Sequence, residues 1–217
     1  MDRPLPISLV VFDCDGILLE SVDVKTKAFA QTVAEHGAEA VTRLIDYHMA
    51  HGGVSRYEKF EWFYREVLGR EITQNELQAL GGRFKQLAFE GVMNAPMVQG
   101  AMDAIEALHG KLPLYVVSGT PHEELNMVLD TRTLTPFFQG IYGSPPDKIE
   151  LLHRIIKQQS VYPAEILMIG DSTTDLMAAQ ECGTLFYGRG RQFEKSGWPW
   201  SNDLHGLVDH IDAKNIG

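Results

Sequence analysis

The chain has 217 residues, of which 44% are apolar and 22% are charged, and its formal net charge at pH 7 is -10. This composition is typical of a soluble globular protein, and the length suits one large domain or one domain with an insertion. The acidic balance argues against a protein that grips nucleic acid, because phosphate-backbone binding needs clustered Lys and Arg. It leaves small anionic substrates open, since a local pocket or a metal ion can overcome the overall field.

No apolar stretch approaches the roughly 20 residues of a membrane-spanning helix. Residues 1–6 lack the apolar region of a signal peptide, so we expect a cytoplasmic protein without a membrane partner. The two cysteines, Cys14 and Cys182, have neither metal-site spacing nor a disulfide pattern, and we expect both to be reduced. For the oligomeric state we expect a monomer or a homodimer.

The first predicted element is a strand over residues 7–12, whose unbroken apolar run is typical of a parallel strand buried on both faces. From residue 21 to about residue 91 the pattern is helical and shows no strand. Residues 25–37, residues 56–70 and the segment after Thr73 each place apolar side chains at helical spacing. The predicted inner face of the third of these helices consists of Leu77, Leu80, Phe84 and Leu87.

After this helical block the pattern changes to strands that alternate with helices. The predicted strands cover residues 112–119, 140–144, 165–171 and 184–188, and the predicted helices cover residues 101–109, 147–158 and 173–180. A further helix is expected to begin at Pro121 with Thr120 as its cap. Such alternation predicts an α/β fold with a doubly wound parallel sheet. The helical block interrupts this sheet after its first strand, so we expect a core of residues 1–17 and 93–217 and an inserted helical cap of residues 18–92.

Polar residues stand where the predicted strands end or where the next helix begins. They are Asp13 and Asp15 after the first strand, Ser118 at the end of the second, Lys148 after the third, and Asp171 and Asp175 after the fourth. Ligands of open α/β sheets bind beyond the carboxyl ends of the strands, so we expect these side chains to meet in space.

Most of these residues also have an interpretation that needs no ligand. Asp15 suits a turn, Asp175 suits a helix-capping box, and Ser118 alone would be an ordinary hydroxyl at a strand end. Asp13 is harder to explain in this way, because it closes a buried strand. Lys148 also indicates a ligand site, since a cation in the first turn of a helix opposes the helix dipole unless an anionic group compensates it.

Adjacent carboxylates become tolerable when a divalent cation lies between them, and hard oxygen ligands of this kind suit Mg²⁺. We expect Asp13 and Asp171 to supply side-chain oxygens to the metal. Asp15 would add its main-chain carbonyl, and Asp175 would either join these ligands or support them. The second oxygen of Asp13 would attack phosphorus and form an aspartyl phosphate. Asp15 would protonate the departing alkoxide and later deprotonate a water.

The phosphoryl group itself needs donors and a positive charge. Ser118 and the main-chain amides of Gly119 and Thr120 would hold the transferring oxygens, while Lys148 would balance their charge. The partner expected from this chemistry is a small phosphorylated metabolite.

Four motifs, in order along the chain, resemble a known family. "DCDGILLES", "VVSGT", Lys148 and "GDSTTD" resemble the signature motifs of the haloacid dehalogenase-like superfamily. The helical insertion is similar to the cap of its β-phosphoglucomutase and phosphoglycolate phosphatase branch. The resemblance implies a Rossmann-like core, Mg²⁺ dependence and the nucleophile role of Asp13.

The second carboxylate, Asp15, favours phosphate esters, because members of the family that act on haloalkanoates or phosphonates lack it. The expected activity is a phosphatase acting on a sugar phosphate, a sugar-acid phosphate or a hydroxy-acid phosphate. A mutase is the alternative, because "GGVSRYE" resembles the β-phosphoglucomutase loop whose Arg grips the non-transferring phosphate, which makes Arg56 a substrate-binding candidate. Against a mutase, Gly170 stands where mutases carry a second acidic metal ligand, and Gly-Thr-Pro-His follows Ser118 where they carry a Lys-Asn pair. Lys25 stands where mutases and many phosphatases carry His.

Two interpretations from another functional class stay open at this point: a phospho-Asp signalling domain and a non-catalytic phosphate-binding protein. A signalling receiver would carry its acceptor Asp after the third strand and would have no cap. His51, Lys59 and His122 are interpreted as surface residues, and residues 198–200, Trp-Pro-Trp, as surface packing.

Overall fold

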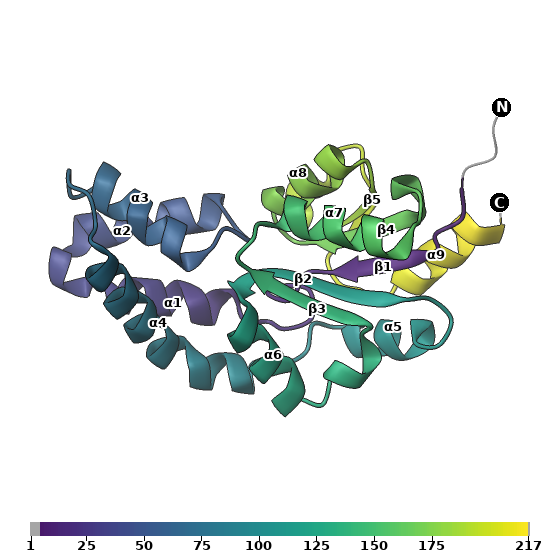
Figure 1. Ribbon diagram of the computed structural model, residues 1–217, viewed down its shortest axis with the longest axis horizontal. Coiled ribbons are helices and arrows are strands. Elements are labelled where there is room, and N and C mark those ends of the chain that lie inside the picture. The colour runs from purple at the N-terminus through teal and green to yellow at the C-terminus, as the bar shows by residue number, and fades with distance from the viewer. Residues whose placement is uncertain (1–4, 217) are drawn as a thin grey trace.

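The computed structural model describes residues 5–216. These residues form a parallel sheet and a separate group of helices, which lies beyond the carboxyl ends of the strands (Figure 1). The strands of the described chain are β1 (Leu9–Phe12), β2 (Leu114–Pro121), β3 (Gly140–Ser144), β4 (Ile166–Gly170), β5 (Leu185–Arg189) and β6 (Trp200–Ser201). Their order in the sheet is β3-β2-β1-β4-β5-β6, and every pair is parallel. The predicted α/β Rossmann-like fold is confirmed.

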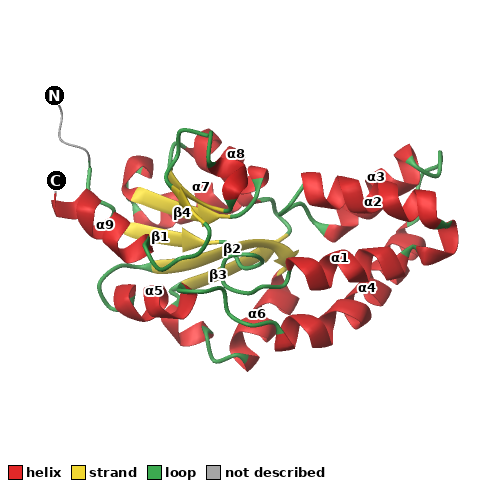
Figure 2. Cartoon of the chain, turned by 180° about the vertical axis from the view of Figure 1, so that it is seen from behind, coloured by secondary structure: helices red, strands yellow, loops and turns green. Residues whose placement is uncertain are grey.

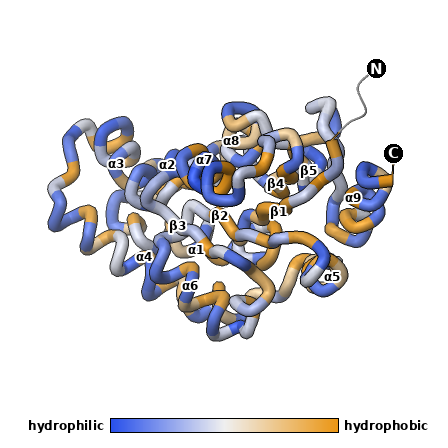
Figure 3. The backbone as a smooth tube through the Cα atoms, turned by 45° about the vertical axis from the view of Figure 1, so that its right-hand side comes forward, coloured by the Kyte–Doolittle hydropathy of each residue, from blue (hydrophilic) through white to orange (hydrophobic). Residues whose placement is uncertain are grey.

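Helices cover both faces of this sheet (Figure 2). They are α5 (Ala101–Leu108), α6 (His122–Thr131) and α9 (Leu207–Ile216) on one face, and α7 (Lys148–Gln159) and α8 (Thr173–Cys182) on the other. Alternate residues of β1 serve the two layers, since Val10 and Phe12 pack on the first face and Leu9 and Val11 on the second. Hydrophobic residues are therefore concentrated around β1 and β4, in the middle of the molecule (Figure 3).

The helices between β1 and β2 are α1 (Val22–Thr32), α2 (Ala38–Ala50), α3 (Arg56–Glu66) and α4 (Gln74–Asn94). They form the group that lies to the left of the sheet in Figure 1, and we call it the cap. Three rings fill its interior, with the centroid of Phe29 at 5.5 Å from that of Phe60 and 4.4 Å from that of Phe84. The division at residues 18–92 stays a prediction.

Two local expectations, for Leu87 and for Thr120, were wrong. Leu87 is 40% exposed, because the buried stripe of α4 runs from Phe84 to Ala88 and Val92 and leaves Leu87 at its side. Trp198 and Trp200 pack against the core, as expected, and Trp200 in addition pairs with Gly188 and begins β6. Thr120 does not cap α6, because β2 continues to Pro121 and α6 has no side-chain cap.

Two further findings concern the chain as a whole. Cys14 and Cys182 are both free and buried. Within residues 5–216, no helix has the length and apolar character needed to cross a bilayer.

The cap interior generates a stability prediction. Phe84→Ala should lower the free energy of unfolding by about 3–5 kcal/mol, because it leaves a cavity among the packed rings. Leu87→Ala, on the same helix, should cost under about 1 kcal/mol because that side chain is already half in water. Urea unfolding followed by circular dichroism measures both, and equal losses would contradict the packing described.

Candidate active site

Three carboxylates converge at the carboxyl ends of two neighbouring strands. Asp13 follows β1, Asp171 follows β4, and Asp175 lies in the first turn of α8. One oxygen from each lies within 4.8 Å of the other two. The pairing of β1 with β4 produces this convergence, because the main-chain N–H of Asp13 donates to the oxygen of Ile169 at 2.9 Å. The predicted meeting of these acids is therefore present in the structure.

Burial makes this cluster electrostatically costly. Burial, together with the charges of Asp175 and Asp15, raises the pKa of Asp13 to about 7, against the lowering effect of Lys148. Burial also raises the pKa of Asp171 well above its ordinary value, and the charges of Asp13 and Asp175 add to the effect. The site thus resists holding its full negative charge, and a divalent cation would relieve that repulsion.

The cluster fits Mg²⁺ in its chemistry and in its local backbone. All three donors are carboxylate oxygens, the hard ligands that Mg²⁺ prefers. Gly16 leaves room beside them, because a Cβ at this position would collide with the carboxylate of Asp171, and its φ of 75° favours glycine. The residues present therefore suit a bound Mg²⁺.

Lys148 lies at the N-terminus of α7 with the anionic partners that the sequence indicated. Its Nζ is 3.0 Å from Oδ2 of Asp13 and 2.5 Å from Oδ1 of Asp175. Burial alone would lower the pKa of Lys148, but the two acids raise it above its ordinary value, so the ammonium stays charged. The same ammonium thus balances the candidate nucleophile and fixes its Oδ2.

Asp175 has both roles that the sequence allowed. It completes a capping box with Ser172, whose N–H donates to Oδ2 of Asp175 at 3.1 Å. Its other oxygen accepts from Lys148, so the residue that completes the capping box of α8 also supports the acidic cluster. Asp175 thereby links α8 to α7.

Asp15 is held by three donors, of which Ser21 and Lys25 stand at the start of α1 and Thr120 stands on β2. Its oxygens accept from Ser21 at 2.6 Å, from Lys25 at 2.5 Å and from Thr120 at 3.0 Å. Burial would raise the pKa of Asp15, but the Lys25 charge and these hydrogen bonds lower it to about 2. Because the hydroxyl of Thr120 donates to Asp15, Thr120 caps no helix. The main-chain carbonyl of Asp15 as a metal ligand stays a prediction.

The predicted phosphate cradle lies at the end of β2. Ser118 is buried, and its Oγ accepts from the main-chain N–H of Thr120 at 3.1 Å. Gly119 lies against the cap loop of residues 51–55, because a Cβ there would collide with the carbonyl oxygen of Gly53. In the same loop the oxygen of Gly52 accepts from the Thr174 hydroxyl. The cap therefore contacts the core beside the predicted phosphate site.

A cavity of about 480 Å³ lies between cap and core. Its core wall includes Asp13, Asp15, Ser118, Gly119, Thr120 and Asp171, and its cap wall includes Lys25, Phe29, His48, Arg56, Lys59 and Phe84. The volume suits a small ligand.

Arg56 lines this cavity, but its guanidinium already has partners. It donates to Oε2 of Glu124 on α6 at 2.6 Å and lies 4.7 Å from the centroid of the Phe84 ring. The residue predicted to grip a second phosphate thus joins cap to core in this structure. The sequence contained no visible sign of Glu124 as its partner.

Lys59 was interpreted as a surface residue, and this was wrong. It is 2% exposed and lines the cavity. The signal that could have placed it is its position one helical turn after Arg56 on α3, and one residue before the buried Phe60.

Comparisons with known proteins agree with this geometry. The chain is 26% identical over 192 residues to a phosphoglycolate phosphatase of Vibrio vulnificus, which covers 84% of this chain and 83% of that protein. It is 24% identical over 201 residues to phosphoglycolate phosphatase 1 of Pseudomonas aeruginosa, covering 83% of this chain and 70% of that protein.

Solved structures share the fold. A β-phosphoglucomutase of Clostridium difficile superposes with a TM-score of 0.79 at 16% identity, covering 97% of both chains. A predicted phosphoglycolate phosphatase of Haemophilus somnus superposes with a TM-score of 0.74 at 19% identity, covering 94% of this chain and 97% of that one. The sequence model of the haloacid dehalogenase-like hydrolases matches residues 7–183. The chain therefore belongs to the haloacid dehalogenase-like hydrolase family.

Proposed function

We propose that the protein is a Mg²⁺-dependent phosphatase that hydrolyses a small phosphorylated metabolite through an aspartyl phosphate on Asp13. The observation that carries this proposal is the cluster of the buried Asp13 and Asp175 with the partly buried Asp171, all within 4.8 Å of one another, next to a cavity that Ser118 also lines. The phosphatase names of the relatives support the same reaction class. The cavity of about 480 Å³ suits a sugar phosphate, a sugar-acid phosphate or a hydroxy-acid phosphate.

The metal site that we propose uses Asp13, Asp171 and the main-chain carbonyl of Asp15. Asp175 supports these ligands while it caps α8 and binds Lys148. When bound, Mg²⁺ would neutralise charge on the transferring phosphoryl oxygens.

Asp13 is oriented for attack by its own hydrogen bonds. Its Oδ1 accepts from the N–H of Cys14 at 2.7 Å, and its Oδ2 lies 3.0 Å from Nζ of Lys148. In the first step an oxygen of Asp13 bonds to phosphorus while the ester P–O bond breaks, and the departing alkoxide takes a proton from Asp15. In the second step a water gives a proton to Asp15 and attacks phosphorus, which releases phosphate and regenerates Asp13.

Asp15 suits the second step as it stands, because Lys25 and Thr120 hold it ionised. For the first step it needs a proton. The negative phosphate of an incoming substrate would raise its pKa, since like charges at close range favour the neutral acid.

The substrate contacts that we propose are the Ser118 hydroxyl, the amides of Gly119 and Thr120, and Lys148 for the phosphoryl group. Arg56 would contribute to the cap wall. Its ion pair with Glu124 weakens the mutase alternative, which needs the guanidinium for a second phosphate.

Substitution of the nucleophile tests the proposed chemistry. Asp13→Asn should reduce the release of phosphate from p-nitrophenyl phosphate on the order of 10⁴-fold or more, because the amide cannot form the aspartyl phosphate. Asp23→Asn, at an exposed position of α1, is the matched control and should keep wild-type turnover. Wild-type turnover in Asp13→Asn would refute the assignment, and no turnover in the wild type with Mg²⁺ would favour a phosphate-binding protein.

The acidic cluster predicts how the stability of the metal-free protein depends on pH. The pKa of Asp13 is about 7 in the folded protein against an ordinary value of 3.8, so between these values the folded state binds more protons than the unfolded state. The contribution of Asp13 to stability therefore falls as the pH rises through this window. The lowered pKa of Asp15 acts only below about pH 4.

The measurement is the melting temperature at pH 5 and pH 8 in EDTA, for the wild type and for Asp13→Asn. The comparison is needed because His48 and Lys59 have lowered pKa values and act in the opposite direction. The melting temperature of the wild type relative to the variant should fall from pH 5 to pH 8, and Mg²⁺ should stabilise the wild type more at pH 8. A pH-independent difference would contradict the electrostatic account of the cluster.

A further inference from the structure

Lys59 on α3 is a buried cation that forms no ion pair with any residue of the described chain. Its exposed fraction is 2%, and its Nζ has one hydrogen-bond partner, Nδ1 of His48 at 2.9 Å. The two other buried cations of residues 5–216 are both neutralised, because Arg56 pairs with Glu124 and Lys148 pairs with two acids of the cluster. A buried ammonium without a carboxylate is costly to keep, so its presence in a cavity wall calls for a ligand.

His48 fixes the direction of the Lys59 ammonium. The Thr26 hydroxyl donates to the oxygen of Val22 at 2.9 Å, so toward Nε2 of His48, 3.1 Å away, it acts as the acceptor. His48 then carries its proton on Nε2 and accepts from Lys59 through Nδ1. The hydrogen bond to His48 uses one N–H of the Lys59 ammonium. The two other N–H groups remain for a ligand in the cavity that Lys59 and His48 both line.

The electrostatics of this pair favour an anion. Burial and the nearby charge of Lys25 together lower the pKa of Lys59 to about 7, although the charge of Asp15 opposes this. Burial and Lys59 lower the pKa of His48 to about 3, so His48 stays neutral and competes for no anion. A negative ligand group would stabilise the charged form of Lys59, which burial disfavours.

The position of Lys59 defines which end of a substrate it meets. The acidic cluster and Ser118 form the core wall, whereas Lys59 belongs to the cap wall with Phe29, whose ring centroid is 5.4 Å from its Nζ, and with Phe84. A phosphate bound at the core wall therefore directs the remainder of a small molecule toward Lys59. With Arg56 neutralised by Glu124 and two aromatic rings nearby, this wall suits a single negative charge better than a second phosphate dianion.

We infer that Lys59, oriented by His48, selects substrates that carry a carboxylate at the end remote from the transferred phosphate. This inference rests on the proposed phosphatase function and narrows its substrate to a phosphorylated hydroxy acid. His48 is a positioning residue, because it acts through Lys59.

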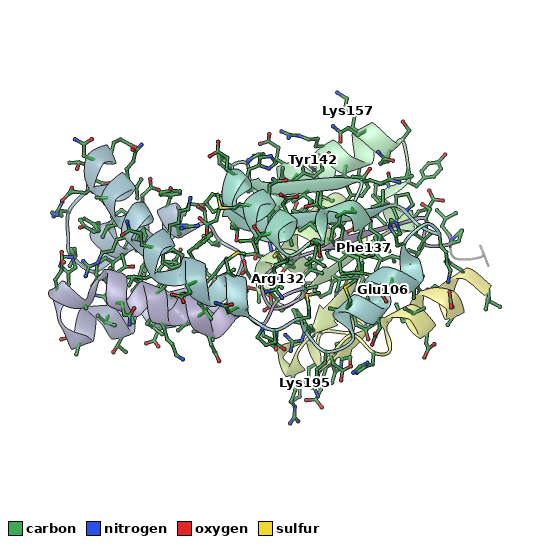
Figure 4. All side chains as sticks on the ribbon, turned by 90° about the horizontal axis from the view of Figure 1, so that it is seen from below. Glu106, Arg132, Phe137, Tyr142, Lys157 and Lys195 are labelled. Carbon is green, nitrogen blue, oxygen red and sulfur yellow. The ribbon has the colours of Figure 1, made fainter. Side chains whose placement is uncertain are left out.

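The test compares two esters that differ only in the remote group: phosphoglycolate, with a carboxylate, and 2-hydroxyethyl phosphate, with a neutral hydroxymethyl group. Binding is measured by calorimetry in EDTA in the Asp13→Asn background, so that neither turnover nor the loss of a proposed metal ligand disturbs it. Phosphoglycolate should bind about tenfold or more tightly than 2-hydroxyethyl phosphate, and adding Lys59→Met should reduce this ratio to about one. The matched control is Lys157→Met, whose side chain projects from the outer face of α7 (Figure 4) and should leave the ratio unchanged.

An unchanged ratio in the Lys59→Met protein, or equal loss of affinity for both esters, would overturn the inference. Because this readout is binding, it is separate from the proposed function, which fails if the wild type releases no phosphate from any ester. Lys59→Met should also unfold at a urea concentration no lower than the parent protein, since it removes a buried unpaired charge. A marked loss of stability would instead assign Lys59 a structural role.

His48 is tested with a conservative pair of variants. His48→Asn keeps an acceptor near the position of Nδ1 and should retain most of the preference for phosphoglycolate. His48→Phe removes the acceptor and should reduce the preference toward that of Lys59→Met. Equal ratios in both variants and the parent would show that His48 does not position Lys59.

Discussion

The structure depends on one electrostatic constraint: three carboxylates lie together in a buried place where a single ammonium compensates them. The parallel pairing of β1 with β4 forces Asp13 and Asp171 to the same edge of the sheet, and α8 adds Asp175. Burial raises the pKa values of the two strand-end acids, so the cluster is incomplete without more positive charge. The start of α7, which presents Lys148, and the absence of a Cβ at Gly16 both serve this arrangement.

The cap contributes the opposite charge and forms one wall of the cavity. Lys25 reaches Asp15 and Thr120, and Arg56 reaches Glu124, so cations of the cap meet acceptors of the core across the cavity. Removal of the cap from the core would break these contacts together.

The fold and the acidic cluster could be predicted because they follow from local patterns: apolar runs define the strands, and strand-end acids must meet at one edge of a parallel sheet. The short strand β6 had no such pattern, since two residues carry no periodicity, and Thr120 looked like a cap because its partner Asp15 lies 105 residues away. The burial of Lys59 also depends on residues far from it in the sequence, so the local pattern alone did not indicate it. A lysine is usually exposed, and its burial depends on how α2 and α3 pack.

Calorimetric titration of Mg²⁺ into the wild-type protein and into Asp171→Asn tests the central claim most directly, because it asks whether the strand-end acids share a cation. The account predicts one Mg²⁺ site in the wild type and a large loss of affinity when Asp171 becomes neutral. Equal Mg²⁺ affinity in the two proteins would mean that the cation, if it binds, lies elsewhere, and the account of the acidic cluster would be wrong.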